Sequence, residues 1–299
     1  MRNLWLWTYI VLYFAFLFVL YRQEGMDPTE PLFIFFVLGV GFSLLALLFT
    51  RDVPPLATPV HDPAQEFVFL VAWLIGLATY LVVGRPYLDA VTAQPLHAIV
   101  IAAAKLLLFV AAPALALIFW RGYSVRDLAP VSLGWRQLRP ALWMSAVILI
   151  FQAVFGRGLR DIAAAHLPAT TLALAVPLTV IWLALEVGIV EEFFFRALLQ
   201  TRAARLVGSE IAGIVIASAL FGLLHAPGLY LRTAGTQEAL SANPSLVSAI
   251  GYSFVITSVA GFFLGTLWAR TRNFAVVVLV HAAADLLPNL APTIKAWHG

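Results

Sequence analysis

Three apolar segments in the C-terminal half of the chain contain acidic, basic and imidazole side chains. A carboxylate and an imidazole that lie together can take a proton from water and so activate it for hydrolysis. Two imidazoles and a carboxylate are also a ligand set that zinc accepts. The residues concerned are Glu186, Glu191, Glu192 and Arg196 in the first segment, Phe221 and His225 in the second, and His281 and Asp285 in the third.

Glu192 and Arg196 are four residues apart with the acid first, which is the favourable order for an ion pair on a helix. Glu191 points about 100° away from Glu192 around the same helix. We therefore expect Arg196 to hold Glu192 as structural support, while Glu191 faces a cavity and acts as the base. Glu186 lies five residues earlier, where it suits either the substrate cavity or helix packing.

His281 and Asp285 also lie four residues apart, on one face of a helix. An imidazole N–H and a neighbouring polar side chain can together bind a developing oxyanion. An ionised Asp285 would instead orient His281 or bind a cation. Phe221 lies one turn before His225 and is expected to form part of the cavity wall.

The composition excludes a water-soluble fold. Of the 299 residues, 62% are hydrophobic and only 11% are charged, whereas a soluble domain has about 25% charged residues. The basic residues are scattered and the net charge is only +3, so nucleic acid is not an expected partner. The absence of cysteine excludes disulfides, thiolate metal sites and a cysteine nucleophile.

The apolar segments predict an all-α, polytopic bundle of transmembrane helices. A span needs roughly 20 mainly apolar residues, and the sequence contains about nine such segments, with eight to ten as the range. They lie at about 4–21, 32–49, 67–84, 99–120, 141–156, 171–198, 210–229, 246–268 and 274–290.

Ionisable groups inside a membrane are costly, and these ones share one depth. Glu191 and His225 each lie 17 residues from Gly208, which marks the turn between their segments. Glu191 is 11 residues from Arg202 and His281 is 9 residues from Arg272, or roughly 14–16 Å at 1.5 Å per residue. The three side chains are therefore predicted to meet near the middle of the bilayer.

The basic residues predict the orientation of the spans. Cytoplasmic loops are rich in Lys and Arg, and alternate assignment of the loops gives one side ten basic residues and the other six. The first side has Arg2, Arg51, Arg121, Arg126, Arg136, Arg139, Arg202, Arg205, Arg270 and Arg272; the second has Arg22, Arg85, Arg157, Arg160, Arg232 and Lys295. The N-terminus is therefore predicted to be cytoplasmic.

Three regions are expected along the chain. Residues 1–120 form an N-terminal region of four spans, residues 121–140 form a cytoplasmic linker, and residues 141–299 form the catalytic membrane domain. Pro140 could open the fifth helix, because the first helical position has an N–H that needs no partner. Gly261 and Gly265 form a GxxxG pattern that favours close helix packing, with a dimer face as the alternative.

The segments EEFFFR at 191–196, FGLLH at 221–225 and HAAAD at 281–285 resemble the EExxxR, FxxxH and HxxxN/D motifs of the CPBP family. That family groups CAAX-processing endopeptidases with bacteriocin-processing and Abi-type membrane proteins, and the resemblance covers about residues 135–290. It implies that Glu191 and His225 activate water and that His281 and Asp285 bind the oxyanion. It also implies that Glu192 and Arg196 give support and that no cofactor is needed.

We expect an intramembrane endopeptidase in the bilayer, most naturally a bacterial inner membrane. Its substrate would be a membrane-associated or lipid-modified protein or peptide, and its cavity would be reachable from the cytoplasmic side. Three alternatives stay open: a zinc-dependent protease that binds metal with Glu191, His225 and His281, a proton-coupled transporter, and a non-catalytic membrane scaffold.

Overall fold

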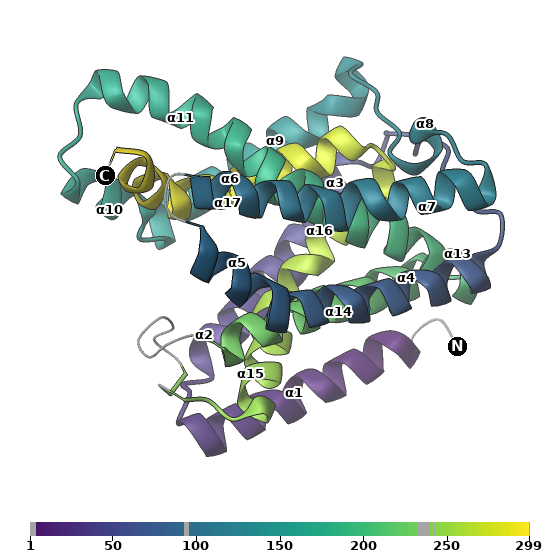
Figure 1. Ribbon diagram of the computed structural model, residues 1–299, viewed down its shortest axis with the longest axis horizontal. Coiled ribbons are helices and arrows are strands. Elements are labelled where there is room, and N and C mark those ends of the chain that lie inside the picture. Colours follow the sequence, from purple (N-terminus) through teal and green to yellow (C-terminus); the bar gives the residue numbers. More distant parts are fainter. Residues whose placement is uncertain (1–3, 93–95, 232–239, 242, 299) are drawn as a thin grey trace.

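The computed structural model describes residues 4–92, 96–231, 240–241 and 243–298. Arg2 and Arg232, which entered the count of basic residues, lie outside this part. Within it the secondary structure is helical, and nine helices are long and apolar enough to cross a membrane (Figure 1). The prediction of a polytopic all-α bundle is therefore confirmed.

The first four spans consist of helices with π-helical stretches, labelled η. They are α1 (Leu4–Glu24); α2 (Thr29–Ile34), η1 (Phe35–Phe42) and α3 (Ser43–Phe49); α4 (Pro63–Thr79), η2 (Tyr80–Gly84) and α5 (Arg85–Val91); and α6 (Leu96–Lys105), η3 (Leu106–Ala111) and α7 (Ala112–Arg121).

The other five spans follow two short connecting helices, α8 (Val125–Leu128) and α10 (Gly158–Ala164). The spans are α9 (Trp135–Phe155); α11 (Ala169–Leu183), η4 (Ala184–Gly188), α12 (Ile189–Glu191), η5 (Glu192–Gln200) and α13 (Thr201–Val207); α14 (Glu210–Tyr230); α15 (Leu246–Tyr252), η6 (Ser253–Thr257) and α16 (Ser258–Thr271); and α17 (Phe274–His298).

The fifth span begins earlier than predicted. Helix α9 starts at Trp135 and contains Pro140, which the sequence placed at the helix start. The reason is contact with the loop after α3: the Gln137 side chain donates to the Pro54 carbonyl at 2.9 Å, and Arg136 donates to the Asp52 carbonyl. These contacts fix the first turn although Pro140 cannot donate a backbone hydrogen bond.

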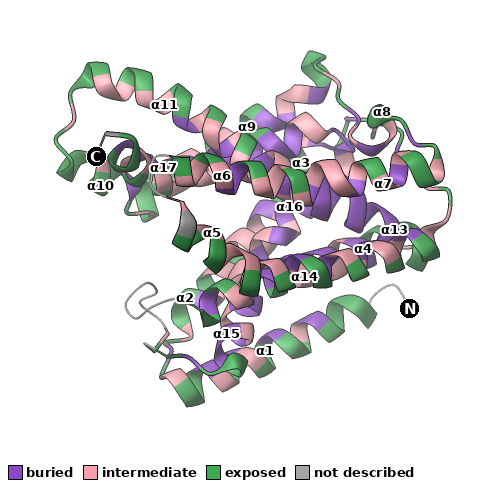
Figure 2. Cartoon of the chain, in the orientation of Figure 1, coloured by how far each residue is buried: buried purple, intermediate pink, exposed green. Residues whose placement is uncertain are grey.

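The last three spans form the centre of the bundle. About half of each of their hydrophobic windows is buried, against 11% in the second span. Figure 2 shows buried residues along α16 and exposed residues along the outer helices α1 and α11. The spans that contain His225 and His281 are therefore enclosed by protein, and the outer spans present apolar side chains to lipid.

Helices α14 and α16 approach each other through small residues. A Cβ at Gly261 would lie 2.7 Å from the Ser218 Cβ, and one at Gly222 would lie 2.6 Å from the Ser258 Cβ. A Cβ at Gly265 would lie 2.9 Å from the Gln200 side-chain oxygen. The GxxxG pattern thus serves close packing within the chain, as predicted.

We expect Gly261→Val to lower the free energy of unfolding by about 1–3 kcal/mol, because its side chain would overlap Ser218. Denaturant titration in detergent measures this loss. Gly76→Val is the matched control, since Gly76 is also helical and nothing lies within 4 Å of an added Cβ. Equal stability of the two variants would contradict close packing at Gly261.

A buried network ties the third span to the sixth. Arg202 Nε lies 2.9 Å from Glu66 Oε2, and the Tyr123 hydroxyl donates to the Glu66 carboxylate at 2.8 Å. Arg202 also donates to the Ala197 carbonyl at 3.1 Å. Glu66 and Arg202 are both buried, so their charges depend on one another. The third span was predicted to begin at about residue 67, just after Glu66, so this network was not predicted.

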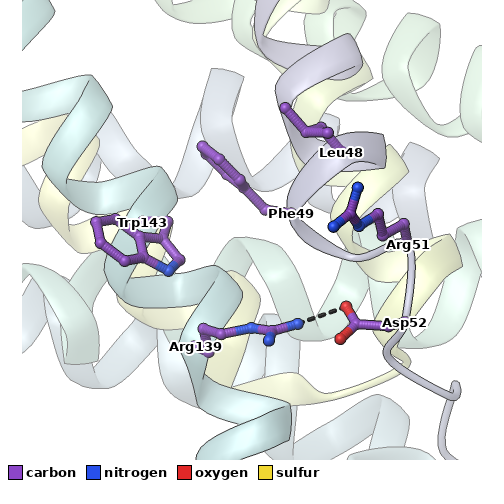
Figure 3. A pocket seen from close by; sticks show the side chains of 6 residues that line it. All are labelled: Leu48, Phe49, Arg51, Asp52, Arg139 and Trp143. Carbon is purple, nitrogen blue, oxygen red and sulfur yellow. Dashed lines mark hydrogen bonds and ion pairs between the residues drawn. The ribbon is translucent and has the colours of Figure 1, made fainter.

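Near the same end of the bundle, a small surface cavity of about 230 Å³ lies between α3 and α9. Figure 3 shows that Arg139 reaches Asp52 across it, with Arg51 beside them and Trp143 on the α9 side. The hydrogen bond from Arg139 holds the pKa of Asp52 below its usual range. This cavity contains none of the predicted catalytic residues.

Candidate active site

The sixth span presents its two central glutamates to different surroundings. Glu192 and Arg196 are fully buried, and Arg196 Nε lies 3.2 Å from Glu192 Oε2. The Arg196 guanidinium also lies over the Phe221 ring, 5.1 Å from its centroid. Glu191 is the last residue of α12 and its side chain is partly exposed. The two glutamates therefore point in different directions, as the helical geometry predicts. Glu192 is paired with Arg196, and Glu191 is accessible.

His225 faces Glu191 from α14. Its Nε2 lies 4.0 Å from Glu191 Oε1. Its Nδ1 lies 2.8 Å from the Phe221 carbonyl oxygen, which can only accept, so Nδ1 carries the hydrogen. The neutral imidazole therefore has its lone pair at Nε2, on the side of Glu191.

His281 approaches the other oxygen of the same carboxylate. Its Nε2 lies 3.8 Å from Glu191 Oε2 and 3.7 Å from Asp285 Oδ2. Its Nδ1 lies 2.8 Å from Glu192 Oε1 and donates to that carboxylate. Glu192 thus links Arg196 to His281, and three carboxylates surround one imidazole.

A cavity of about 390 Å³ lies on the exposed side of Glu191 and His225. Of the eight residues selected from the sequence, Glu191 and His225 line it. Phe221 lies behind His225, in edge-to-face contact with that ring, and is buried. The lining residues are Tyr80, Leu81, Arg85, Lys105 and Phe109 from the N-terminal spans; Val190, Glu191 and Phe195 from the sixth; Leu224, His225, Gly228 and Leu229 from the seventh; and Tyr252, Ile256 and Thr257 from the eighth.

Residues 173–287 match the family model described as Rce1-like, "Type II CAAX prenyl endopeptidase Rce1-like". This segment is an Rce1-like domain. The match agrees with the resemblance to CAAX-processing proteases and supports a membrane protease of the CAAX type in general. No curated protein and no solved structure matched the chain.

The Rce1-like domain contains every side chain that the sequence analysis assigned to the chemistry. It begins within α11 and ends within α17, so the first five spans lie outside it. The cavity crosses this boundary, because five of its lining residues belong to the third and fourth spans. The domain therefore contains all the side chains predicted to be reactive, and the N-terminal spans supply part of the cavity wall.

Glu186 forms an ion pair that the sequence analysis did not predict. Lys105 Nζ lies 2.5 Å from Glu186 Oε1, joining the fourth span to the Rce1-like domain. Glu186 is not among the cavity-lining residues, whereas Lys105 is. The available signal was the position of Lys105 inside an apolar segment, where a charged residue needs a partner.

The cavity lies in the half of the bundle away from the arginine-rich end, whereas the sequence analysis expected access from that end. Arg85, Leu229 and Tyr252 lie in the halves of their spans that adjoin the opposite turns. At the arginine-rich end the spans are tied together by the pairs Arg202–Glu66 and Arg272–Glu210. Depth counted from the arginines predicted the level of the site, but it could not show in which half the spans diverge.

The described residues include no group of three His, Asp or Glu side chains placed to hold a metal ion. His281 uses its Nδ1 to bind Glu192, so its Nε2 is the ring nitrogen that it turns toward Glu191. The zinc-ligand hypothesis named Glu191, His225 and His281, and these residues come together around one carboxylate. Independence from metal stays a prediction.

Proposed function

We propose that the protein is a membrane-embedded endopeptidase in which Glu191 and His225 activate water for attack on a peptide bond. The observation that carries this proposal is the pairing of Glu191 Oε1 with His225 Nε2, 4.0 Å apart in the cavity of an Rce1-like domain. Its substrate would be a membrane-associated or lipid-modified protein or peptide.

The separation of the two groups suits one water molecule held between them. A distance of 4.0 Å is too long for a direct hydrogen bond, but it can be bridged by a water that contacts both atoms. The water oxygen would bond to the substrate carbonyl carbon while Glu191 takes its proton. When the carbon–nitrogen bond breaks, that proton would pass to the leaving amine. The reaction needs no covalent intermediate.

His281 and Asp285 are proposed to bind the oxyanion on the other side of Glu191. His281 donates Nδ1–H to Glu192, so it has a second N–H at Nε2 only as an imidazolium. The carboxylates of Glu191 and Glu192, at 3.8 Å and 2.8 Å from its ring nitrogens, supply the counter-charge. Asp285 would bind the oxyanion in its protonated form, because only a protonated carboxyl has a hydrogen to donate. Glu192 and Arg196 act as positioning residues, because they hold His281 from a fully buried ion pair.

We expect Asp285→Asn to retain kcat/KM within about tenfold, since an amide can also donate to an oxyanion. Asp285→Leu should lose about 10²-fold, the cost of removing one such group. Steady-state cleavage by the purified protein measures both. If the asparagine variant loses as much activity as the leucine variant, Asp285 does not act through a hydrogen bond to the oxyanion.

The protein is an integral membrane protein, and its assignment to a bacterial inner membrane with a cytoplasmic N-terminus is part of the proposal. If the arginine-rich end is cytoplasmic, as the basic residues predict, the cavity lies in the outer half of the membrane. Reporter fusions to the described loops at each end would determine the orientation.

The function is tested by comparing new peptide termini of membrane proteins in cells that express the wild type or Glu191→Gln. Wild-type termini that are missing in the variant support the endopeptidase and identify its substrates. The cleavage is then repeated with purified protein, with and without a zinc chelator. Loss of cleavage with the chelator would support the metalloprotease, and identical termini in both cells would support the transporter or scaffold.

A further inference from the structure

The small surface cavity between α3 and α9 combines charged with apolar side chains. Its polar part is formed by Arg51, Asp52 and Arg139, and its apolar part by Leu48, Phe49 and Trp143. All six residues lie outside the Rce1-like domain and outside the cavity that contains Glu191. The proposed peptidase activity therefore gives this cavity no role.

The chain segment that follows α3 collects more positive than negative charge. Arg136 donates to the Asp52 carbonyl, and Arg139 donates to the Asp52 carboxylate. Arg270 donates to the Thr50 carbonyl at 3.3 Å. In the part of the chain that the structure describes, Asp52 is the one carboxylate that forms an ion pair with any of these three arginines. Positive charge therefore remains uncompensated at this end of the bundle.

Arg51 adds a cation that has no partner. Its exposed side chain forms no ion pair or hydrogen bond with any other described residue, so the donors of its guanidinium are available. Arg139 uses one terminal nitrogen for Asp52 and keeps its other donors. Figure 3 shows that the Arg51 and Arg139 side chains extend toward the cavity from opposite sides. A ligand with several acceptor oxygens could contact both.

The start of α9 independently favours an anion. Its first turn contains no acidic residue, and Arg136 and Arg139 both lie within its first five residues. The N-terminus of a helix carries a partial positive charge, so cations are unfavourable there and a bound anion is favourable. Asp52 supplies only part of the negative charge that this helix start can accept.

The apolar end of the cavity faces the lipid. Leu48 and Trp143 are 52% and 54% exposed, and both belong to helices that are long and apolar enough to span the membrane. Trp143 lies four residues after Arg139, or about 6 Å further along α9 toward the bilayer centre. Tryptophan is common at this level of a membrane protein. Cations on the outside and apolar side chains on the inside match the order of phosphate and acyl chain in a phospholipid.

We infer that Arg51 and Arg139, assisted by Arg136, bind the phosphate of an anionic phospholipid whose acyl chain lies along Leu48 and Trp143. Guanidinium groups form strong, often bidentate hydrogen bonds with phosphate, and basic pockets between membrane helices bind anionic head groups. A zwitterionic phospholipid carries its own cation, which the uncompensated arginines would repel. The site therefore selects lipids of net negative charge, and this selection does not depend on the proposed peptidase activity.

The test measures how phospholipids with brominated acyl chains quench the fluorescence of Trp143 in the full chain, purified in a nonionic detergent. Each protein is measured with and without Trp143→Phe, and the difference isolates Trp143 from the other tryptophans. Brominated phosphatidylglycerol and brominated phosphatidylcholine are titrated separately. We expect half-maximal quenching at a mole fraction about tenfold lower for phosphatidylglycerol, because more than one arginine acts on its phosphate.

Three variants assign this preference to the cavity. Arg51→Gln should weaken phosphatidylglycerol binding about fivefold and leave phosphatidylcholine unchanged, whereas Arg51→Lys should keep most of the preference. Asp52→Asn should strengthen phosphatidylglycerol binding, because it removes a competing negative charge and keeps an acceptor for Arg139. Stronger binding in this variant is not expected if the Asp52–Arg139 pair serves the fold alone.

Arg126→Gln is the matched control, because Arg126 is an exposed arginine of α8 at the same end of the bundle and does not line the cavity. It should leave the binding of both lipids unchanged. In a competition arm, unlabelled phosphatidylglycerol should displace its brominated form, and glycerol phosphate should not.

Three results would overturn the inference. Equal quenching of the wild type by both lipids would deny selection by charge. An equal loss for both lipids in Arg51→Gln would make Arg51 a structural residue. Displacement by glycerol phosphate as readily as by unlabelled phosphatidylglycerol would make the cavity a site for a soluble phosphate.

Discussion

Replacing Glu191 by glutamine is expected to lower kcat by about 10²–10⁴-fold with little change in KM, because glutamine keeps the shape of the side chain but cannot take a proton from water. The carboxylate is the group that both histidines approach, with His225 at 4.0 Å from one oxygen and His281 at 3.8 Å from the other. Steady-state cleavage of a substrate found from the new termini measures the loss.

Two variants make this experiment specific. Glu191→Asp keeps the carboxylate but withdraws it by one methylene group, so its kcat should fall between those of the wild type and the glutamine variant. Glu30→Gln is the control, since Glu30 is an exposed carboxylate at the start of the second span. A glutamine variant that keeps more than a tenth of the wild-type kcat would remove Glu191 from the role of base.

Replacing Glu66 by leucine is expected to lower the free energy of unfolding by about 3–5 kcal/mol, because Arg202 would stay buried without its counter-charge. The Glu66 carboxylate accepts hydrogen bonds from Arg202 at 2.9 Å, from Tyr123 at 2.8 Å and from the Asp62 backbone at 3.1 Å. Denaturant titration in detergent, followed by circular dichroism, measures the loss.

The double variant Glu66→Leu with Arg202→Met separates a buried charge from general loss of packing. Since it leaves no unpaired charge, it should be more stable than Glu66→Leu alone. Asp89→Asn is the control, because the exposed Arg85–Asp89 pair should contribute only about 0.3–0.5 kcal/mol. A double variant less stable than the single one would show that the network contributes chiefly through its contacts.

The number and positions of the spans could be predicted from the sequence because bilayer thickness fixes the length of an apolar helix. The shared depth of Glu191, His225 and His281 could be predicted for a related reason, since residues equally far from a turn lie side by side in a hairpin of helices. Their relative distances in the structure agree with that geometry.

Contacts between distant segments could not be predicted. The pairs Lys105–Glu186 and Glu66–Arg202 join residues 81 and 136 positions apart, and no periodicity encodes such a partner. The start of α9 depended on contacts of Arg136 and Gln137 with the loop after α3, which overrode the preference of Pro140 for a helix start. The place of the cavity depended on where spans diverge, which hydropathy does not report.

The close approach of α14 and α16 also limits how the protein can move. Gly222 lies one turn before His225 and packs against Ser258, with no room for even a methyl group. Sliding one helix along the other would drive side chains into this contact, so His225 and α16 must move as one rigid body. Any widening that admits a substrate must therefore come from the opposite wall, where η2 and α5 carry residues that are mostly exposed or half-buried. His225 would then stay fixed on α14 while the opposite wall of the cavity moves.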